Sequence, residues 1–399
     1  MEHTKLLQHV LMLVQGYIYP NELELQWSLL IVLYPFITGL VAGAFILASL
    51  VKVFDIHQVK DTYRLALLTA LSFLLGAPLP LNLHLGQPFR AHEIFMTPNP
   101  TSAMAMFGFV YMWYLTAVLL IELWLDYRKE IVEWSKTTAF PLNLFYKALT
   151  LGVCEVTPRA DALDHKIARI IAVVGIPSAF LLHGYVGFIF GSIKANPWWS
   201  TPLMPIIFVC SAIVSGIAAV LLIYVVSCVA RDVEINMECL DSIAKFLLVS
   251  LITAFSLEVL ELIQKTYEAE EHFSIIVLLM EGKLFLSLLI VQIFMGVLIP
   301  LFSFSLPLLV DIREGVRKIL YVISAVLILV GIFAMRWNVV IGGQFFSKSY
   351  LGFTTYKLGL AGREGLLSAM FLMVLPLFIL YVLARLFPPW VPESGKSRG

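Results

Sequence analysis

Ionisable side chains that interrupt long apolar stretches are the clearest candidates for chemistry in this sequence. They are His183, Arg336, Glu258 and Glu261. An ionisable group is costly inside a hydrocarbon layer, so it usually faces a cavity, a partner side chain or a proton path. The ordinary pKa of histidine lies near neutrality, so His183 is suited both to hydrogen-bond a ligand oxygen and to pass a proton. The alternative is a structural histidine that is satisfied by a neighbouring helix.

Three charged residues form a stripe. Glu258, Glu261 and Lys265 recur at i, i+3 and i+7, so they share one face of a helix. At the rise of an α-helix, Glu258 lies roughly 13 Å below the nearer membrane surface. The stripe therefore predicts a path for protons that links a buried pocket to solvent.

Glu122 is a further acidic residue, near the end of another apolar run. Asp126 and Arg128 follow it closely and begin a charged connection. This position favours a simple carboxylate at the membrane interface. A buried Glu122 would instead form the inner mouth of a proton path.

Composition sets the class of protein. Of the 399 residues, 60% are hydrophobic and 14% are charged, and the formal net charge is zero. The mean hydropathy of +0.90 is far above that of soluble domains and indicates an integral membrane protein. A neutral total gives no sign of nucleic-acid binding. The cysteines show no CxxC or other metal-ligand spacing, so we expect no metal site and no iron–sulphur cluster in this chain.

Apolar runs of spanning length predict an all-α membrane protein with about nine transmembrane helices, within a range of eight to ten. The runs cover residues 27–54, 62–85, 101–126, 166–192, 203–229, 242–268, 284–309, 317–342 and 364–387. Residues 4–19 are a candidate for a short extra helix, whereas 274–280 is too short to span. The basic connection from 127 to 165 is amphipathic near 140–151, which predicts a helix lying on the membrane surface.

Loop charges predict the orientation of the chain in the cell membrane. Lys and Arg number eight on the side of the N-terminus and eighteen on the other side, with Arg336 left out because it falls inside a run. Cytoplasmic loops carry the excess of positive charge. We therefore expect the N-terminus outside and the C-terminus in the cytoplasm.

A weak internal repeat relates the first and fifth predicted helices. Thr-Gly-Leu-Val-Ala-Gly at 38–43 matches Ser-Ala-Ile-Val-Ser-Gly at 211–216. Both are faces of small residues that let helices approach closely. The repeat predicts two parallel four-helix bundles, at 27–192 and 203–342. An outer N-terminal segment (1–26) would precede them, and an outer loop, terminal helix and cytoplasmic tail (343–399) would follow.

Three polar motifs cluster at the predicted outer face. They are His-Leu-Gly-Gln-Pro-Phe-Arg-Ala at 84–91, the stretch 183–205 with its Lys-Ala-Asn-Pro-Trp-Trp turn at 194–199, and Arg-Trp-Asn-Val-Val-Ile-Gly-Gly-Gln at 336–344. Trp198 and Trp199 would suit the headgroup layer as an interfacial anchor. The alternative is a loop that docks a partner and faces a cofactor.

These motifs resemble the NrfD/PsrC family, the quinone-reactive membrane subunits of polysulphide reductase-like complexes. The predicted helix number is closest to the larger branch, found in HybB-type hydrogenase subunits and in the Hmc and DsrP subunits of sulphate reducers. The resemblance implies a subunit of anaerobic respiration or sulphur metabolism that oxidises or reduces menaquinone or another quinone at the outer face, without haem. It also implies an exported ferredoxin-like iron–sulphur subunit and further redox subunits as partners, and it leaves proton translocation open.

The resemblance and the polar residues together give the expected site. A quinone needs an apolar slot and hydrogen-bond partners that exchange protons. We expect these partners to be His183 at the centre, with Arg336, Asn338, Glu258 and Tyr111. The proton path is expected to use Glu258, Glu261 and Glu122, and the partner interface to use Pro88, Arg90, Lys194, Trp198 and Trp199.

Two other classes of function fit parts of the sequence. A b-type cytochrome would use His84 and His183 as haem ligands, but their depths differ by roughly 10 Å by helical rise. A secondary transporter would explain the repeat and the buried charges, but transporter repeats are usually inverted or carry broken helices.

Overall fold

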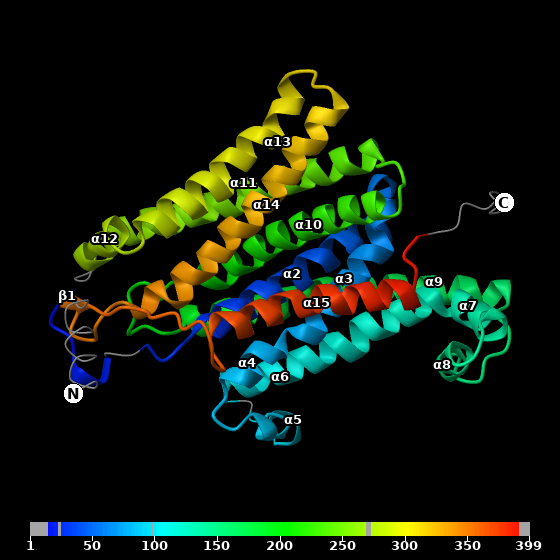
Figure 1. Cartoon of the computed structure of the whole chain (residues 1–399), viewed down its shortest axis with the longest axis horizontal. Helices are drawn as coiled ribbons and strands as arrows, with labels where there is room; N and C mark the ends of the chain where they lie inside the picture. Colours follow the sequence, from blue (N-terminus) through cyan, green and yellow to red (C-terminus); the bar gives the residue numbers. More distant parts are fainter. Residues whose placement is uncertain (1–14, 23–24, 98, 100, 269–272, 391–399) are drawn as a thin grey trace.

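The computed structural model describes residues 15–22, 25–97, 99, 101–268 and 273–390. Within these residues, nine helices are long and apolar enough to cross a membrane, as the sequence predicts. The extra helix considered for residues 4–19 falls mostly outside the described part of the chain. In Figure 1 the chain enters the first span at one end of the molecule and leaves the ninth span at the other.

Several spans are built from more than one helical element. The first four are α2 (Leu29–Lys52), η2 with α3 and α4 (His57–Thr62, Tyr63–Gly76, Pro78–His84), α6 with η4 and α7 (Ala103–Trp113, Tyr114–Leu120, Ile121–Thr137), and α9 (Pro158–Gly191). The next four are α10 (Met204–Ala230), α11 (Met237–Glu268), η5 with α13 (Phe285–Leu298, Ile299–Leu309), and α14 (Glu314–Val340). The ninth is α15 (Leu366–Leu386).

The connections carry short elements. They are η1 (Pro20–Glu22), η3 (Pro88–Arg90), α5 (Glu93–Met96), α8 (Leu142–Leu149), α12 (Phe273–Glu281) and η6 (Gly342–Gln344). The strands β1 (Gln15–Gly16) and β2 (Gly352–Phe353) pair antiparallel, with Gln15 opposite Phe353. α8 and α12 fall where the sequence predicts an amphipathic helix and a stretch too short to span.

Local sequence explains where several helices begin. Ser28, Ser102 and Thr157 each precede a helix, and each side-chain oxygen accepts a hydrogen bond from a backbone N–H of the first turn. Such caps satisfy donors that have no partner within the helix. Pro158 then occupies the first position of α9, where its missing N–H costs nothing.

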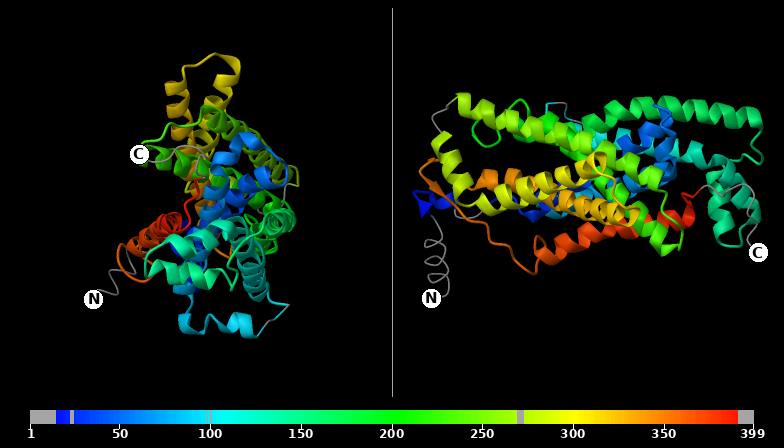
Figure 2. Two further views of the ribbon diagram at one scale, coloured as in Figure 1. Left: turned by 90° about the vertical axis from the view of Figure 1, so that its right-hand side faces the viewer. Right: turned by 90° about the horizontal axis from the view of Figure 1, so that it is seen from above.

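The first eight spans can be described as two groups of four that follow the order of the internal repeat. The first contains α2, α3–α4, α6–η4–α7 and α9, and the second contains α10, α11, η5–α13 and α14 (Figures 1 and 2). α2 and α10 pack against each other at the centre and are buried along most of their length. α15 packs on α3 beside the first bundle.

The two central helices meet at glycines. A Cβ atom added to Gly43 would lie 2.7 Å from the Cα atom of Gly216, and it would also clash with the carbonyl oxygen of Ala212. Gly39, one turn earlier, faces the ring of His183. Because glycine has no side chain, the two backbones can approach closely here. These are the small residues whose repetition in the sequence predicts a close helix crossing.

Replacing Gly43 by alanine should therefore destabilise the protein by about 1–3 kcal/mol, because the overpacked crossing forces the backbones apart. Thermal unfolding in detergent micelles measures the effect. Gly86→Ala is the matched control, since a Cβ there would meet nothing within 4 Å. Equal unfolding temperatures for the two variants would contradict this account of the crossing.

The third span differs from the sequence prediction. It continues to Thr137 instead of ending near residue 126, so Asp126 and Arg128 are helical and do not begin a loop. Its middle, η4, is a π-helix, and so is η5 in the second bundle. π-helical turns often occur at functional sites.

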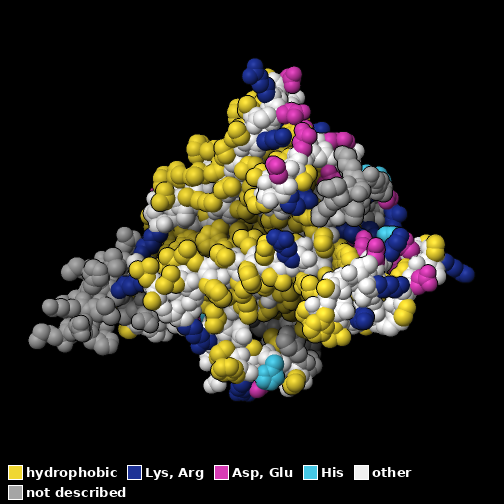
Figure 3. All heavy atoms as spheres, turned by 45° about the vertical axis from the view of Figure 1, so that its right-hand side comes forward, with side chains coloured by type: hydrophobic (Ala, Val, Ile, Leu, Met, Phe, Trp, Pro, Cys, Tyr) yellow, Lys and Arg dark blue, Asp and Glu magenta, His cyan; other side chains and the backbone are white. Residues whose placement is uncertain are grey.

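The surface has the character that a membrane requires. The face in Figure 3 has broad hydrophobic areas; most of its charged side chains lie toward the upper and right-hand parts, and others lie at the left and lower edges. A lipid layer solvates apolar side chains and excludes charged ones, so this distribution fits a multi-pass membrane protein.

Candidate functional site

Two cavities lie at the same end of the molecule, one in each bundle. The first-bundle cavity, of about 690 Å³, is bounded by the starts of α2 and α6 and by the ends of α4 and α9. The second-bundle cavity, of about 130 Å³, is bounded by the starts of α10 and η5 and by the ends of α11 and α14. These are corresponding places in the internal repeat. We call this end the cavity end, and the end where α15 finishes the C-terminal end.

The first-bundle cavity is mostly apolar. Its polar lining consists of Tyr34, Asn82, His84, His92 and Tyr111. The hydroxyl of Tyr111 donates to the carbonyl oxygen of Leu74 at 3.0 Å. Tyr111 thus lies in a cavity, as expected, but apart from the other four residues expected around the quinone.

Two buried polar atoms of residues in this lining form no hydrogen bond with a described residue. Asn82 Oδ1 is buried and has no hydrogen-bond partner among the described residues. His84 Nδ1 lies 3.2 Å from Glu364 Oε2, but the two are not aligned as a hydrogen bond. Buried polar atoms normally have partners, so these two atoms fit a site that water or a polar headgroup fills.

The loop between α4 and α6 covers the first-bundle cavity. Residues on both sides of its tip contribute to the lining: Leu85, Ala91, His92 and Ile94. Pro88 is half-buried, whereas Phe89 is 94% exposed. Arg90 donates to both carboxylate oxygens of Glu93 at 2.8 Å, and this contact holds the pKa of Glu93 below its ordinary value. The tip is therefore exposed and suited to contact a partner.

A chain of hydrogen bonds lines the second-bundle cavity. Gln292 Nε2 donates to Glu258 Oε2 at 3.0 Å, and Asn338 Nδ2 donates to Gln292 Oε1 at 2.8 Å. Ser287 Oγ then donates to Asn338 Oδ1 at 2.6 Å. The cavity thus joins apolar walls to a carboxyl group that is held in place by amides.

The stripe on α11 follows the wall of this cavity. Glu258, Glu261 and Lys265 all contribute to its lining. Lys265 Nζ lies 3.1 Å from Glu261 and donates to the carbonyl oxygen of Trp198 at 2.7 Å. Trp198 in turn donates to the carbonyl oxygen of Asn338 at 2.9 Å. The spacing in the sequence therefore locates a wall of the cavity correctly, with Lys265 and Trp198 at its mouth.

His183 and Arg336 lie between the bundles, outside the linings of both cavities. Both are fully buried. Arg336 Nη2 lies 3.0 Å from His183 Nε2 and 2.6 Å from Ser211 Oγ, and the guanidinium stacks on the ring of Phe208. Because arginine can only donate, Nε2 must accept, and the ring proton sits on Nδ1, which is 3.3 Å from Thr38 Oγ1.

This geometry changes the expected role of His183. Both of its ring nitrogens contact protein groups, which matches the alternative of a structural histidine and leaves neither nitrogen free for a haem iron. Arg336 Nη1 lies 3.6 Å from the sulphur of Met335, a residue in the lining of the second-bundle cavity. His183 is thus a hydrogen-bond partner of Arg336, which lies next to that cavity but outside its lining.

The loop from 192 to 203 is fastened to the end of α14. Trp199 Nε1 donates to the carbonyl oxygen of Val339 at 2.6 Å, and its ring stacks on Trp27. Trp199 is 6% exposed, Trp198 is half-buried and Lys194 is exposed. Among the interface residues expected in this loop, Lys194 is the one with an exposed side chain, whereas Trp199 anchors the loop internally.

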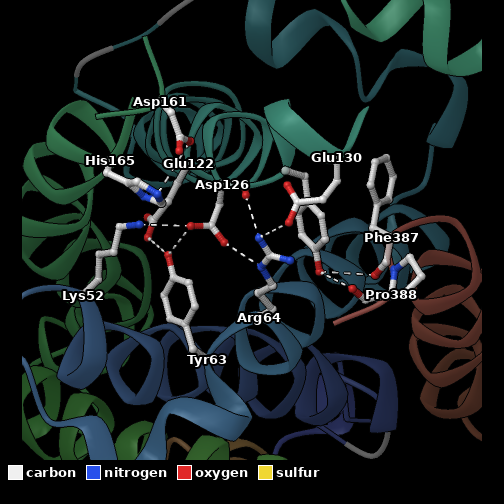
Figure 4. A network of polar contacts seen from close by, with 11 residues as sticks. Lys52, Tyr63, Arg64, Glu122, Asp126, Glu130, Asp161, His165, Phe387 and Pro388 are labelled. Atoms are coloured by element: carbon white, nitrogen blue, oxygen red, sulfur yellow. Dashed lines mark hydrogen bonds and ion pairs between the residues drawn. The ribbon is translucent and has the colours of Figure 1, made fainter. Parts of the chain in front are cut away.

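A carboxylate cluster lies at the C-terminal end of the first bundle (Figure 4). Glu122 is 1% exposed, so the interpretation as an interfacial carboxylate is wrong. The side chain is buried because α7 continues to Thr137 and α2 and α3 contribute Lys52 and Tyr63 around it. Tyr63 Oη lies 3.5 Å from Glu122 Oε1 and 3.4 Å from Asp126 Oδ1. Glu122 is thus buried, which is what the alternative interpretation as the inner mouth of a proton path requires.

Sequence reasoning missed Asn82 and Gln292 and considered His84 only as a haem ligand. Gln292 is the one amide between residues 285 and 309, so an isolated polar residue in an apolar run marks it. Asn82 and His84 alternate with leucines at the end of an apolar run. That pattern shows they are near the membrane edge, but it cannot show that they line a cavity.

The fold and its two cavities define a multi-pass helical membrane protein with paired four-helix bundles. The family model described as polysulphide reductase, NrfD, matches residues 20–348. The chain therefore belongs to the NrfD family, which confirms the resemblance of its motifs.

Relatives of several named kinds share parts of the sequence. A selenate reductase subunit of Mesobacillus selenatarsenatis is 34% identical over 50% of this chain and 47% of its own length. Protein NrfD of Escherichia coli is 27% identical over 50% of this chain and 59% of its own length. The Hdr-like menaquinol oxidoreductase integral membrane subunit of Archaeoglobus fulgidus is 23% identical over 82% of this chain and 72% of its own length. The chain thus spans about half the length of the first two relatives, and membrane subunits of reductase complexes recur among the names.

Proposed function

We propose that this protein exchanges electrons between a membrane quinone, such as menaquinone, and an iron–sulphur subunit docked at the cavity end. The first-bundle cavity carries the proposal, because its volume of about 690 Å³ lies in the range of about 300–1,000 Å³ typical of small-molecule sites. Membership of the NrfD family and the menaquinol named for the Archaeoglobus relative support the same function.

The lining residues fit a quinone headgroup. A bound quinone supplies redox chemistry in which electrons and protons move together. His84 is placed to donate to a ring oxygen or to accept a proton from it, and the amide of Asn82 orients the same headgroup. Tyr111 and the apolar walls exclude water around the ring. Of the residues that the sequence predicts around the quinone, this proposal retains Tyr111. It makes His84 the principal proton-exchanging residue.

The second-bundle cavity receives a supporting role. Arg336, Asn338 and Glu258, which were expected to hold the quinone, surround this smaller space, and we propose that Glu258 and Glu261 conduct protons through it toward the cavity end. A second candidate is that the headgroup itself inserts here. The volume of about 130 Å³ favours that candidate, since a cavity of about 150 Å³ can bind a single benzene ring.

We propose that the cavity end faces the outside of the cell membrane. The excess of Lys and Arg on the other side supports this orientation. An exported ferredoxin-like iron–sulphur subunit would then contact the loop that covers the first-bundle cavity, and further redox subunits would complete the complex. The exposed Phe89 and Arg90 at the loop tip support this contact.

Charge reversal at the proposed interface should weaken assembly. Arg90→Glu and Lys194→Glu each place a negative charge on an exposed loop at the cavity end, and a rim charge mainly changes association and its salt dependence. Co-purification of the iron–sulphur subunit at rising salt measures the effect. Arg159→Glu, an exposed position at the start of α9, is the control. A complex as salt-resistant as the wild type in both variants would leave these loops as lipid anchors.

The proposed function is tested by turnover. The protein, purified with its iron–sulphur partner and with intact clusters, should oxidise a menaquinol analogue or reduce a menaquinone. Cluster absorbance and quinone absorbance recorded in the same sample measure both sides of the reaction. Failure in both directions would remove the quinone assignment.

A further inference from the structure

Two carboxyl groups one helical turn apart in α7 have very different partners. Asp126 contacts Lys52 at 3.0 Å and Arg64 at 3.1 Å. Glu122 makes no ion pair with a described residue, and its Oε2 atom is buried without a hydrogen-bond partner among them. Neighbouring carboxylates disfavour each other's ionised form, and nearby cations decide which of them stays charged. Lys52 and Arg64 thus compensate the charge of the Asp126 carboxylate, whereas Glu122 has no compensating cation among the described residues.

The remaining charges around Glu122 are already paired. Arg64 of α3 also contacts Glu130 of α7 at 2.7 Å. On α9, which packs against α7, Asp164 pairs with Arg128 at 2.8 Å, and Asp161 lies 3.8 Å from His165. Each cation near the cluster therefore has a carboxylate other than Glu122. Ionisation of Glu122 would place an uncompensated charge in a buried site.

Tyr63 joins Glu122 to the solvent side of the cluster. Its hydroxyl lies between Glu122 Oε1 and Asp126 Oδ1, and a hydroxyl can donate and accept at once. From Asp126 the contacts continue through Arg64 to Glu130, whose side chain is 29% exposed. Figure 4 shows these side chains converging from α2, α3 and α7.

Tyr114 lies between Glu122 and the first-bundle cavity along the same span. It is fully buried, and its hydroxyl has no hydrogen-bond partner among the described residues. Tyr111, three residues earlier in the same span, lines the cavity. Unpartnered buried polar atoms usually mark the places of internal water. Tyr114 and Glu122 are thus two unpartnered buried polar groups in the span that runs from the cavity to the C-terminal end.

We propose that Glu122 is a proton-loading carboxyl that serves the first-bundle cavity from the C-terminal end of the bundle. It holds a proton at rest and exchanges it with solvent through Tyr63. In this exchange Tyr63 gives its hydroxyl proton to the Glu122 carboxylate, and the Tyr63 oxygen takes a proton from a solvent hydronium ion or buffer acid on the side of Asp126. One proton thus moves from solvent to Glu122, and no electrons do. Only the onward transfer past Tyr114 to the cavity rests on the proposed function.

Infrared spectroscopy of the protein in lipid nanodiscs tests the resting state without any quinone or partner. The carboxyl C=O band of protonated Glu122 should be present at neutral pH, shift in D₂O, and be absent from Glu122→Gln. Glu133→Gln, which removes an exposed carboxylate from the same helix, is the control and should keep the band. In Tyr63→Phe the band should persist while its deuterium exchange slows at least several-fold. An infrared carboxyl C=O band in Glu122→Gln that is the same as in the wild type would overturn the proposal. Deuterium exchange at the wild-type rate in Tyr63→Phe would overturn the proton route through Tyr63.

Proteoliposomes containing the complex test the onward transfer. Quinone turnover by the wild type should build a membrane potential, and Glu122→Gln should lose that potential. A potential of wild-type size in Glu122→Gln would overturn the transfer to the cavity. Absence of quinone turnover in the wild type would count against the proposed function instead, and the infrared result would still decide the state of Glu122.

Discussion

Replacing His84 by alanine is expected to lower quinone-dependent electron transfer by about 10²- to 10⁴-fold, the usual contribution of a positioned general acid or base. His84 is the ionisable side chain of α4 in the lining of the first-bundle cavity, and its Nδ1 atom lies 3.2 Å from Glu364 Oε2 without forming a hydrogen bond. The protein should still fold and bind its partner, because His84 is half-buried and no helix crossing depends on it. Steady-state oxidation of a menaquinol analogue, normalised to cluster content, measures the loss.

His57→Ala is the control for that experiment. His57 is exposed in η2, at the C-terminal end of the molecule, and its loss should leave turnover unchanged. A normal rate in His84→Ala, with the complex assembled, would show that the headgroup is held elsewhere.

Removing His183 is expected to destabilise the protein. His183→Ala deletes the acceptor at 3.0 Å from a fully buried guanidinium, and a buried donor left without its partner costs about 1–3 kcal/mol, or more when it is charged. The substitution removes one buried polar side chain and alters no helix backbone, so the expected cost comes from the Arg336 donor that is left without this acceptor.

The double variant His183→Leu with Arg336→Met tests whether the destabilisation comes from the unpaired Arg336 guanidinium or from the loss of side-chain volume. Replacing both partners by apolar side chains of similar volume removes the unpaired charge, so the unfolding temperature in detergent should recover at least in part. If His183→Ala alone unfolds at the wild-type temperature, the contact with Arg336 contributes nothing to stability. A double variant less stable than His183→Ala would also contradict the explanation.

The sequence predicts the transmembrane architecture well, because hydrophobic length and small-residue faces act locally. Nine runs become nine helices within the described residues, and the match between 38–43 and 211–216 marks the crossing at Gly43. The third span is the exception. A run of charged residues after Glu122 suggests a loop, but ion pairs with Lys52 and Arg64 keep those residues in a buried helix.

The site is less predictable, since depth in the membrane does not tell which way a side chain faces. Helical rise places His183 and Glu258 at similar depths, yet Glu258 lines a cavity and His183 lies between the bundles. The direction in which the His183 side chain faces depends on the packing of α9 against α2 and α10, and no local sequence pattern predicts that packing. The stripe of Glu258, Glu261 and Lys265 was predictable because its members share one helix.

The internal repeat explains why both cavities lie at one end. In each bundle the first and third spans start there, and the second and fourth finish there. The two sites have nevertheless diverged. The first-bundle cavity is larger and its polar lining includes His84 and Asn82, whereas the second is small and contains Glu258 and Glu261.

The location of the quinone is tested most directly by photolabelling with an azido-menaquinone analogue, followed by peptide mapping of the assembled complex. The account predicts that the label attaches to residues 78–94 or 107–112, the parts of α4, its following loop and α6 that line the first-bundle cavity. Excess menaquinone should compete with it. Competed labelling confined to residues 255–265 and 335–339, on α11 and α14, would place the quinone in the second-bundle cavity and contradict the central claim.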